Sequence, residues 1–528
     1  HDTVWLGESR EHLPTHGDSL MCGFVCLWNI GDEQLARRMI GKIAHRGPDA
    51  VAIARLEGAP VVMAHCRLSI IGTQNGAQPI HQTPDLLVVN GEIYNHEDLR
   101  AILGESAFET ASDSEAILHL FRSGASRWID RLDGMFAFVL ATRERMIAAR
   151  DPLGIKPLYL ARIGEGHAFA SELKAFDGIE VDSLDAIPPG TLYDSRDGWR
   201  RWYRTPHGAA EIEPGLDVEH TAHELRLVLE EAVAKWMIAD VEVGAFLSGG
   251  LDSSIIASIA QKVRLESGRG PLKTFSVGTE GSPDLMAARE VAAHIGSDHR
   301  EHTFTARDIA ENLGHVIYHL ESADVDLVRS AIPTLFAARL ARKEVKAVLT
   351  GEGADELFAG YTYHHAYVDD PRALADELTR SLGTMHNINL QRVDRITMAE
   401  SLEARTPFLD RDLIDFTQSI PAALKLRRTD PGSTESTGPT TEKWILRKAC
   451  ADLLPDSLVW RKKAQFDEGS GTVAALKGAF ELMTNHDEEE NGRAAEARLY
   501  ERILRDRFVN AERVLENAGR WAGDRVTP

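Results

Sequence analysis

The sequence lacks an apolar run of about 18 residues, the length that a helix needs to span a bilayer, and this excludes a transmembrane helix. It also lacks the basic start and apolar core of a secretory signal peptide. Cysteine is scarce, with four in 528 residues, and their irregular spacing fits neither a disulfide framework nor a CxxC metal site: Cys22, Cys26, Cys66 and Cys450. These absences predict a soluble protein of a reducing, cytoplasmic compartment.

Positive charge is also in short supply. Lys and Arg number 59 against 81 Asp and Glu, a formal net charge of -22, and no basic run of any length occurs. Nucleic acids and anionic membranes bind surfaces rich in Lys and Arg. The sequence therefore predicts no nucleic-acid or membrane partner, although a single small anion in a focused pocket stays possible.

The length of 528 residues exceeds one compact core and predicts two to four domains. Residues 1–20 begin with His and are interpreted as a leader or added sequence before a natural start at Met21. From 21 to 204, short β-like runs between turns predict stacked sheets with helices outside. Residues 205–217, rich in Pro, Gly and acids, predict a linker. From 218 to 528, strands alternate with helices and predict an α/β domain with a parallel sheet.

The segment Ser248–Ser254, with the sequence SGGLDSS, lies between an expected strand over 241–247 and an expected helix over 253–263. Its glycines allow a sharp turn close to a ligand. The helix N-terminus supplies free N–H groups and positive potential for an anion, and Asp252 adds a carboxylate suited to Mg²⁺. The plain alternative is a glycine turn with serine helix caps. The strand–loop–helix setting favours a phosphate-binding loop.

A second acidic loop, Thr350–Glu356, also follows an expected strand. Ligands of open α/β sheets bind beyond the carboxyl ends of the strands, so both loops are expected at one crevice. There Asp252 and Asp355 could share a metal, while Glu352 serves proton transfer or orders an intermediate. The alternative is acidic residues that complement a helix dipole. The run 461–463 (RKK) offers a cation for a transferring phosphoryl or adenylyl group, unless it is simply a solvated surface.

In the first half, Cys22 is a candidate nucleophile, because a thiol at a chain start can give its proton to its own α-amine; a buried strand cysteine is the alternative. Arg46 could grip a carboxylate bidentately. Asn90 and Gly91 offer the amide and the main-chain N–H of an oxyanion hole. Asp113 offers a carboxylate for an ammonium group. A capping box from Ser112 to Glu115, opening a helix, is an additional interpretation of that segment.

These motifs, in this order, resemble those of the glutamine-dependent asparagine synthetases. The likeness runs from Met21 to about Gly471 and includes the segments 65–70 (HCRLSI), 149–159 (ARDPLGIKPLY), 170–174 (ASELK) and 401–410 (SLEARTPFLD). It implies an N-terminal-nucleophile (Ntn) glutaminase sandwich over 21–204, followed by an ATP-pyrophosphatase-type synthetase domain over 218–528. Ammonia released in the first domain would travel internally to the second.

The resemblance also implies roles for individual residues. Cys22 would attack the glutamine amide, with Asn90 and Gly91 as oxyanion hole. The glutamine-binding set would be Arg46, Gly47, Pro48, Asp49, Asn90, Gly91, Glu92 and Asp113. The ATP and pyrophosphate site would comprise Leu247, Ser248, Gly249, Gly250, Asp252, Ser253, Ser254, Val277, Thr350 and Gly351. Asp252 and Asp355 would bind Mg²⁺. Glu352 and Lys463 would support the acyl-adenylate and its attack by ammonia.

The acceptor site departs from the family pattern. Arg329 is kept as an acceptor-binding candidate, but Asp326 stands where the bacterial enzymes carry Thr, and Asn389 aligns with an Asp. Aspartate is the first expected acceptor. Another biosynthetic carboxylate, acted on by a tailoring amidotransferase, is the alternative, and a non-catalytic sensor or scaffold is a remote one. The family suggests a homodimer.

The position of Cys22 adds a condition. With 21 residues before it, its nitrogen is an amide and cannot act as a base. The 528-residue form is therefore expected to use mainly free ammonia, and a form that begins at Cys22 to use glutamine.

Overall fold

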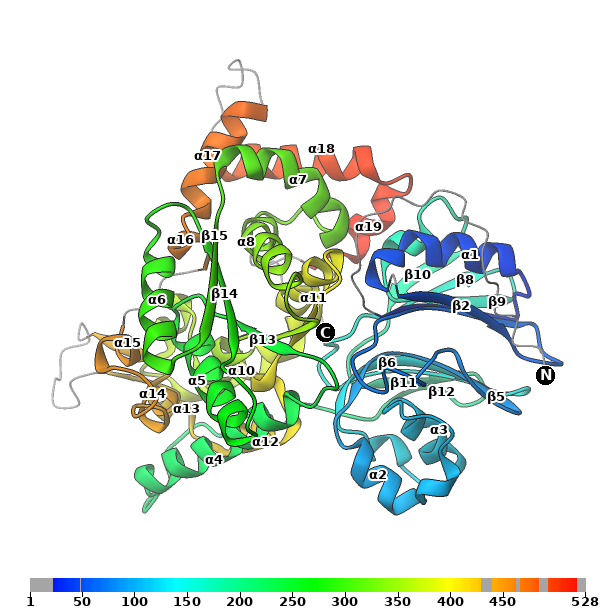
Figure 1. Ribbon diagram of the computed structural model, residues 1–528, viewed down its shortest axis with the longest axis horizontal. Helices are drawn as coiled ribbons and strands as arrows, with labels where there is room; N and C mark the ends of the chain where they lie inside the picture. The colour runs from blue at the N-terminus through cyan, green and yellow to red at the C-terminus, as the bar shows by residue number, and fades with distance from the viewer. Residues whose placement is uncertain (1–21, 48, 429–438, 462–465, 484–491, 520–528) are drawn as a thin grey trace.

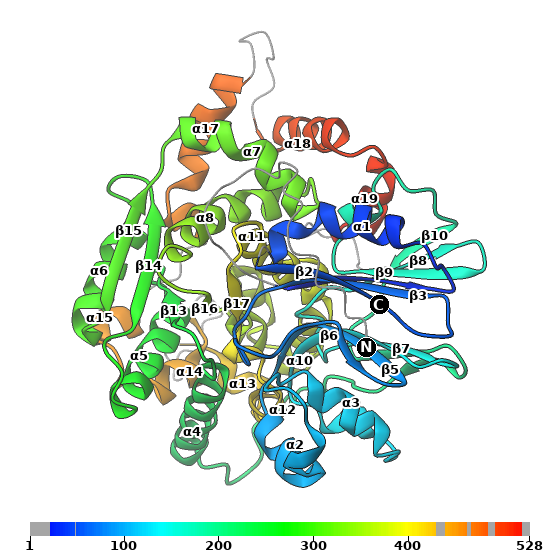
Figure 2. The ribbon, with the colours of Figure 1, turned by 45° about the vertical axis from the view of Figure 1, so that its right-hand side comes forward.

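The computed structural model describes residues 22–47, 49–428, 439–461, 466–483 and 492–519. Its first part contains two six-stranded antiparallel sheets that lie face to face (Figures 1 and 2). The first sheet has the order β10 (Ser183–Ala186), β8 (Tyr159–Ile163), β9 (Gly166–Ala170), β1 (Gly23–Trp28), β3 (Val61–Arg67) and β2 (Ala50–Arg55). The second has the order β12 (Gly198–Arg201), β11 (Thr191–Asp194), β7 (Met146–Arg150), β6 (Gly134–Ala141), β5 (Asp85–Ile93) and β4 (Ile80–Gln82).

Side-chain alternation explains this sandwich. In β1, Phe24 and Cys26 point into the core between the sheets, whereas Val25 and Leu27 point to the opposite face, where helix α1 (Glu33–Lys42) covers them. Successive strand residues face opposite sides, so a strand buried on both faces is apolar throughout. Helices α2 (His96–Leu103) and α3 (Glu115–Arg122) belong to the core on the outer face of the second sheet. The expected sandwich with outer helices is confirmed.

The capping box expected at α3 is wrong. The helix begins at Glu115, and no side-chain hydrogen bond caps it. The Glu115 carboxylate instead accepts from the main-chain N–H groups of Glu109 and Thr110, at 2.8 Å each. Ser112 lies too early in the chain to act as the N-cap.

The second part is built on a five-stranded parallel sheet. Its order is β15 (Asp298–Thr303), β14 (Lys273–Gly278), β13 (Val243–Phe246), β16 (Ala347–Leu349) and β17 (Glu403–Arg405). The helices of the central region are α4 (Val218–Trp236), α5 (Leu251–Glu266), α6 (Pro283–Ile295), α7 (Ala306–Leu320), α8 (Val325–Ala341), α9 (Ala354–Phe358), α10 (Pro371–Thr384) and α11 (Asn389–Ala399). The predicted α/β domain is confirmed. β12 ends at Arg201 and α4 begins at Val218, with no helix or strand between them.

The remaining elements follow the sheet. They are α12 (Arg411–Ser419), α13 (Ala422–Lys425), the hairpin β18 (Leu426–Arg428) and β19 (Thr440–Glu442), α14 (Trp444–Ala449), α15 (Asp456–Val459), α16 (Phe466–Gly469), α17 (Thr472–Met483), α18 (Arg493–Arg507) and α19 (Ala511–Asn517). Short 3-10 turns occupy Ala44–Arg46, Glu105–Ala107, Trp128–Arg131, Leu173–Phe176, Thr362–Tyr367, Met385–Asn387 and Pro407–Leu409. Of the helices described, none is both long and apolar enough to cross a membrane.

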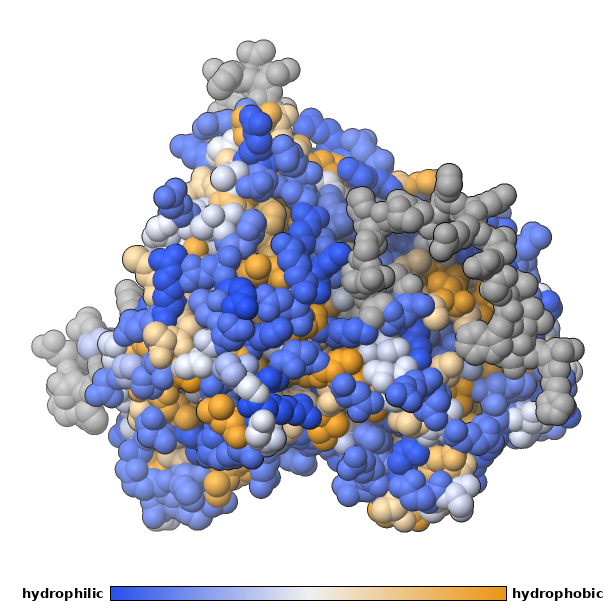
Figure 3. All heavy atoms as spheres, viewed as in Figure 1, coloured by the Kyte–Doolittle hydropathy of each residue, from blue (hydrophilic) through white to orange (hydrophobic). Residues whose placement is uncertain are grey.

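The two parts share one buried interface. A single hydrophobic cluster contains Leu68, Tyr94 and Met135 of the first part together with α4 and β13 of the second. α19 returns to the first sheet beside β10 (Figure 1), where Asn510 donates to Asp177 at 2.8 Å. Hydrophilic residues predominate on the face shown in Figure 3, and apolar residues are scattered among them.

Candidate active site

Cys22 lies immediately before β1 and is half-buried. Its Sγ accepts from the Leu68 N–H at 3.3 Å, and its thiol donates to the Leu68 carbonyl at 3.4 Å. Burial raises the pKa of Cys22 to about 12. The thiol is therefore neutral in this conformation and needs a base or a change of surroundings to react.

Asn90 and Gly91 lie in β5 and have the properties of an oxyanion hole. The Asn90 Nδ2 group is buried and has no hydrogen-bond partner among the described residues. Such an orphaned donor is costly unless a ligand satisfies it. Gly91 has a φ of 137°, and a side chain there would collide with the Met135 carbonyl. The position accepts only glycine.

Glu92 and Asp113 are buried beside the same strand end. Asp113 accepts from the Ile93 N–H at 2.6 Å. Burial raises the pKa of both carboxyl groups, and their mutual repulsion adds to the shift at Glu92. Glu92 Oε2 has no hydrogen-bond partner in the part of the chain that the structure covers. An ammonium group would relieve this repulsion.

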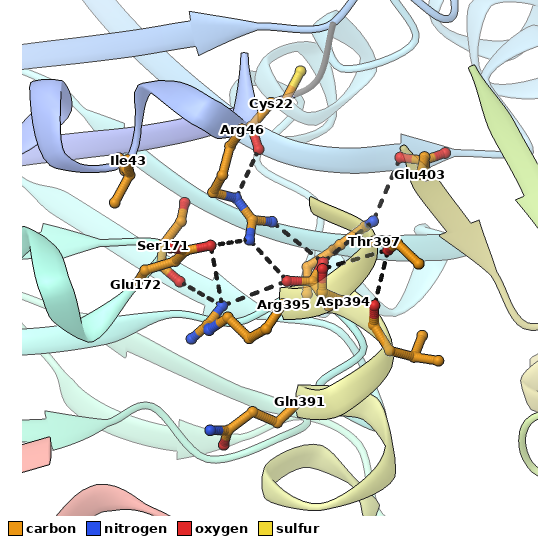
Figure 4. Close-up of polar contacts among 12 residues, drawn as sticks. Cys22, Ile43, Arg46, Ser171, Glu172, Gln391, Asp394, Arg395, Thr397 and Glu403 are labelled. Carbon is orange, nitrogen blue, oxygen red and sulfur yellow. Dashed lines mark hydrogen bonds and ion pairs between the residues drawn. The ribbon is translucent and has the colours of Figure 1, made fainter. Parts of the chain in front are cut away.

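Arg46, which was predicted to bind the glutamine carboxylate, is paired with two carboxylates of the chain itself. Its side chain is fully buried. It contacts Glu172 at 2.5 Å and Asp394 at 2.9 Å, and its Nε donates to the Cys22 carbonyl at 3.1 Å (Figure 4). Gly47 is buried next to it, and Asp49 is exposed, 4.0 Å from Lys346. Pro48 lies outside the described residues.

Arg67 is a cation beside the thiol that the motif reasoning missed. It ends β3, directly before Leu68, which contacts Cys22. Burial raises the pKa of the Cys22 thiol, and the charge of Arg67 opposes part of that rise. Its guanidinium is half-buried and donates to the Gly72 carbonyl at 2.7 Å. The available signal was its place in the segment 65–70, which the resemblance had already identified.

A second site is a cavity of about 320 Å³ beyond the carboxyl ends of β13, β14 and β16. The structure brings the two predicted loops together there. The predicted residues that line the cavity are Leu247, Ser248, Gly250, Asp252, Ser253, Val277, Thr350, Gly351, Glu352 and Asp355. Gly249 and Ser254 are not among the lining residues. The Gly249 carbonyl accepts from Arg461 at 3.0 Å, and Ser254 Oγ donates to the Gly250 carbonyl at 2.7 Å.

Lys443 joins the two predicted metal ligands and was not anticipated. Its Nζ lies 2.5 Å from both Asp252 and Asp355. Burial opposes its charge, but the two carboxylates outweigh burial and hold the pKa of Lys443 above its usual value.

No cluster of three or more His, Cys, Asp or Glu residues suits a metal in the described chain. However, Asp252 Oδ1 is buried without a hydrogen-bond partner. Two carboxylates plus substrate phosphates fit Mg²⁺, which keeps several waters.

Residues of α9 and α11 also line the cavity. Arg392 of α11 forms an ion pair with Glu352. Asn389 donates to Glu356 at 2.9 Å and to Tyr361 Oη at 2.8 Å. Burial and the charge of Asp355 raise the pKa of Glu356 to about 7. Lys463 lies outside the described residues.

Of the two acceptor candidates, only Asp326 lines the cavity, although both lie on α8. Asp326 lines the cavity and pairs with Arg493 of α18 at 2.5 Å. Arg329 is not a lining residue and forms a bidentate pair with Glu496 of α18, at 2.7 and 2.8 Å. Both candidates therefore contact the helix that begins at Arg493.

The first domain is a sandwich with Cys22 near Glu92 of β5, the strand that also carries Asn90. It is joined to a parallel-sheet domain with an acidic loop cavity, and this arrangement defines a two-domain amidotransferase. The glutamine amidotransferase domain family matches residues 21–186, and the asparagine synthase family matches residues 224–373 and 366–523. Asparagine synthetase [glutamine-hydrolyzing] 2 of Oryza sativa subsp. japonica is 38% identical over 473 residues, which cover 85% of this chain and 78% of that protein. The Sandersonia aurantiaca asparagine synthetase [glutamine-hydrolyzing] is 35% identical over 520 residues, 92% and 96% of the two chains. The chain belongs to the glutamine-hydrolysing asparagine synthetase family.

Proposed function

We propose that this protein makes asparagine from aspartate, ATP and glutamine. The observation that carries the proposal is the joining of two complementary sites on one chain. One holds Cys22 near Glu92 of β5, the strand that also carries Asn90, whose amide nitrogen has no partner among the described residues. The other is an acidic loop cavity over a parallel sheet. The relatives named above support this activity.

In the glutaminase site, Cys22 attacks the side-chain amide carbon of glutamine. The tetrahedral oxyanion accepts hydrogen bonds from the Asn90 Nδ2 and the Gly91 N–H groups. Ammonia leaves as a γ-glutamyl thioester forms, and water then releases glutamate. We assign the glutamine α-carboxylate to Arg67, because Arg46 is enclosed by Glu172 and Asp394. Glu92 and Asp113 receive the α-ammonium.

In the synthetase site, ATP lies over Leu247 and Val277, and the N–H groups that follow Ser248 bind its β- and γ-phosphates. The aspartate β-carboxylate attacks the α-phosphorus, and pyrophosphate leaves. Ammonia then attacks the acyl carbon of the β-aspartyl-AMP, and AMP leaves. Lys443 offsets negative charge between the carboxylates. Asp252 and Asp355 would hold Mg²⁺, which neutralises phosphate charge when bound. Glu352 and Lys463 remain the proposed residues for the ammonia step.

Aspartate is compatible with the unusual acid in the cavity. The carboxylate of Asp326 is paired with Arg493, so its repulsion of an anionic acceptor is reduced. A different biosynthetic carboxylate is the second candidate, favoured by Asp326 and by the use of Asn389 within the Glu356–Tyr361 contacts.

A pyrophosphate-release assay decides between these acceptors. Aspartate and a panel of other carboxylates are supplied with ATP and with either ammonia or glutamine. We expect AMP, pyrophosphate and asparagine with aspartate. Formation of ADP would contradict the acyl-adenylate, and turnover of another carboxylate without aspartate turnover would establish the second candidate.

The setting of the reaction is also a proposal. All four cysteines lie in the described part and are free, which supports a reducing, cytoplasmic compartment. The acidic net charge of -22 supports small-molecule partners rather than nucleic acid or membrane. A homodimer rests on the family resemblance.

A further inference from the structure

A fully buried charge network lies between the two domains. It contains five cations and five carboxylates, all of them buried: Arg46, Lys156, Lys174, Arg395 and Arg405 with Glu92, Glu172, Glu321, Asp394 and Glu403. One of its members is Arg46, which pairs with Glu172 and Asp394 and which the glutaminase chemistry above does not use. Because buried charges must stay paired, the members of such a network can move only together.

Arg46 connects the nucleophile to the synthetase domain. Its Nε donates to the Cys22 carbonyl at 3.1 Å. Its two terminal nitrogens donate to Asp394 of α11, at 2.9 and 3.2 Å. Burial opposes the charge of Asp394, but Arg46 and Lys156 outweigh it and hold the pKa of that carboxyl below its usual value. Figure 4 shows this chain of contacts from Cys22 through Arg46 to Asp394.

The same helix reaches the synthetase cavity. α11 has 11 residues and is about 16 Å long. Its Arg392, two residues before Asp394, pairs with Glu352 in the cavity. Its first residue, Asn389, contacts Glu356 and Tyr361 there. α11 is therefore a rigid element with one set of side chains in the cavity and the next turn in the Cys22 network.

We propose that α11 couples the two sites, and that Asp394, acting through Arg46, is a positioning residue for the Cys22 nucleophile. This inference rests on the proposed function. Ligands in the cavity contact Glu352 and so bias the position of Arg392 and of α11. The Asp394–Arg46 pair carries that bias to the Cys22 carbonyl and moves the thiol out of its contacts with Leu68. Glutamine is then hydrolysed when the acceptor is ready.

The reactivity of the Cys22 thiol can be used to measure the coupling. Alkylation of Cys22 by iodoacetamide is followed by mass spectrometry in the full chain, with and without a non-hydrolysable ATP analogue, magnesium and aspartate. In the wild type we expect filling the cavity to raise the alkylation rate at least about fivefold. In Asp394→Asn, Cys22 should be alkylated at the same rate with and without the cavity ligands. Ammonia-dependent pyrophosphate release should stay near the wild-type value. A purely structural role would lower both readouts together and would overturn the proposal.

Two further variants sharpen the test. Arg46→Lys keeps the charge beside Glu172 and Asp394 but lacks the Nε donor to Cys22, so it should also lose the response. Asp133→Asn is the matched control, because Asp133 contacts Lys235 across the same domain interface at 2.7 Å, away from Cys22; it should keep the full response.

An unchanged alkylation rate in the ligand-filled wild type overturns the coupling. The proposed function is tested separately, by wild-type pyrophosphate release with ammonia and aspartate. Loss of that reaction overturns the function, whereas normal release with an unresponsive Cys22 overturns the coupling alone.

Discussion

Arg46 and Arg67 lie near the same cysteine in very different surroundings. Arg46 is enclosed by carboxylates, whereas Arg67 is half-buried and donates to the Gly72 main-chain carbonyl. Removing Arg67 as Arg67→Met should raise the KM for glutamine about 10- to 100-fold, because a charged hydrogen bond to the substrate is lost. Ammonia-dependent synthesis should stay near normal.

Arg46→Met is the matched comparison. It removes one of the cations that pair with both Glu172 and Asp394, and breaking a buried ion pair costs about 3–5 kcal/mol. We therefore expect a lower thermal midpoint or failure to fold. A stable Arg46→Met protein with only a raised KM for glutamine would restore the motif-based assignment.

The burial of His65 predicts that the stability of the protein depends on pH. It is fully buried, and its Nε2 lies 3.1 Å from the Val89 carbonyl. Burial lowers the pKa of His65 to about 3. Below about pH 6.5 the unfolded chain binds a proton that the folded protein does not, so stability falls by about 1.4 kcal/mol per pH unit toward pH 3. Above about pH 6.5 this effect disappears, and stability is retained in full.

The thermal midpoints of the wild type and of His65→Gln, measured between about pH 7.5 and about pH 5.5, check this effect. The glutamine amide can still donate to Val89 but does not titrate. The wild-type midpoint should fall more steeply than that of the variant. Equal slopes would show that His65 does not contribute.

The motifs predicted which residues share a site better than they predicted the contacts of those residues. Asp252 and Asp355 could be placed at one crevice, because both follow strand ends of a parallel sheet. Lys443, which joins them, comes from a distant segment without a recognisable signal. The surroundings of Arg46 could not be predicted, because a motif does not show that a guanidinium is enclosed by Glu172 and by Asp394, which lies 348 positions later in the chain.

At the scale of elements, α18 holds both acceptor candidates. Arg493 pairs with Asp326, and Glu496 pairs with Arg329. Arg493→Met should raise the KM for aspartate about two- to fivefold without changing that for ATP, because an exposed pair is modest in strength and Asp326 then repels the acceptor. Initial rates of pyrophosphate release check this.

Arg505→Met is the control for that change. Arg505 lies on the same helix and pairs with Glu501 and Glu512, so its removal should leave the KM for aspartate unaltered. Adding Asp326→Asn to Arg493→Met should restore the wild-type KM. A persistent rise would mean that Arg493 acts by another route.

The sequence patterns predicted the strand, loop and helix of the phosphate-loop segment correctly. The expected helix over 253–263 is the middle of α5, Leu251–Glu266, and the expected strand over 241–247 contains β13. The capping box was wrong because a short polar pattern does not fix where a helix begins. The docking of α18 on α8 could not be predicted, since it depends on tertiary ion pairs.

For the whole molecule, the buried interface predicts how the protein unfolds. One hydrophobic cluster crosses from Leu68 and Tyr94 to α4 and β13, the charge network beside Cys22 joins both domains, and α19 returns to the first sheet. If one domain unfolded alone, buried charges of the other domain would lose their ion-pair partners. We therefore expect one calorimetric transition for both domains. Arg46→Lys should lower its midpoint without splitting it. Two well-separated transitions in the wild type would show that the domains are stable independently, and that α11 does not hold the two sites in one rigid unit.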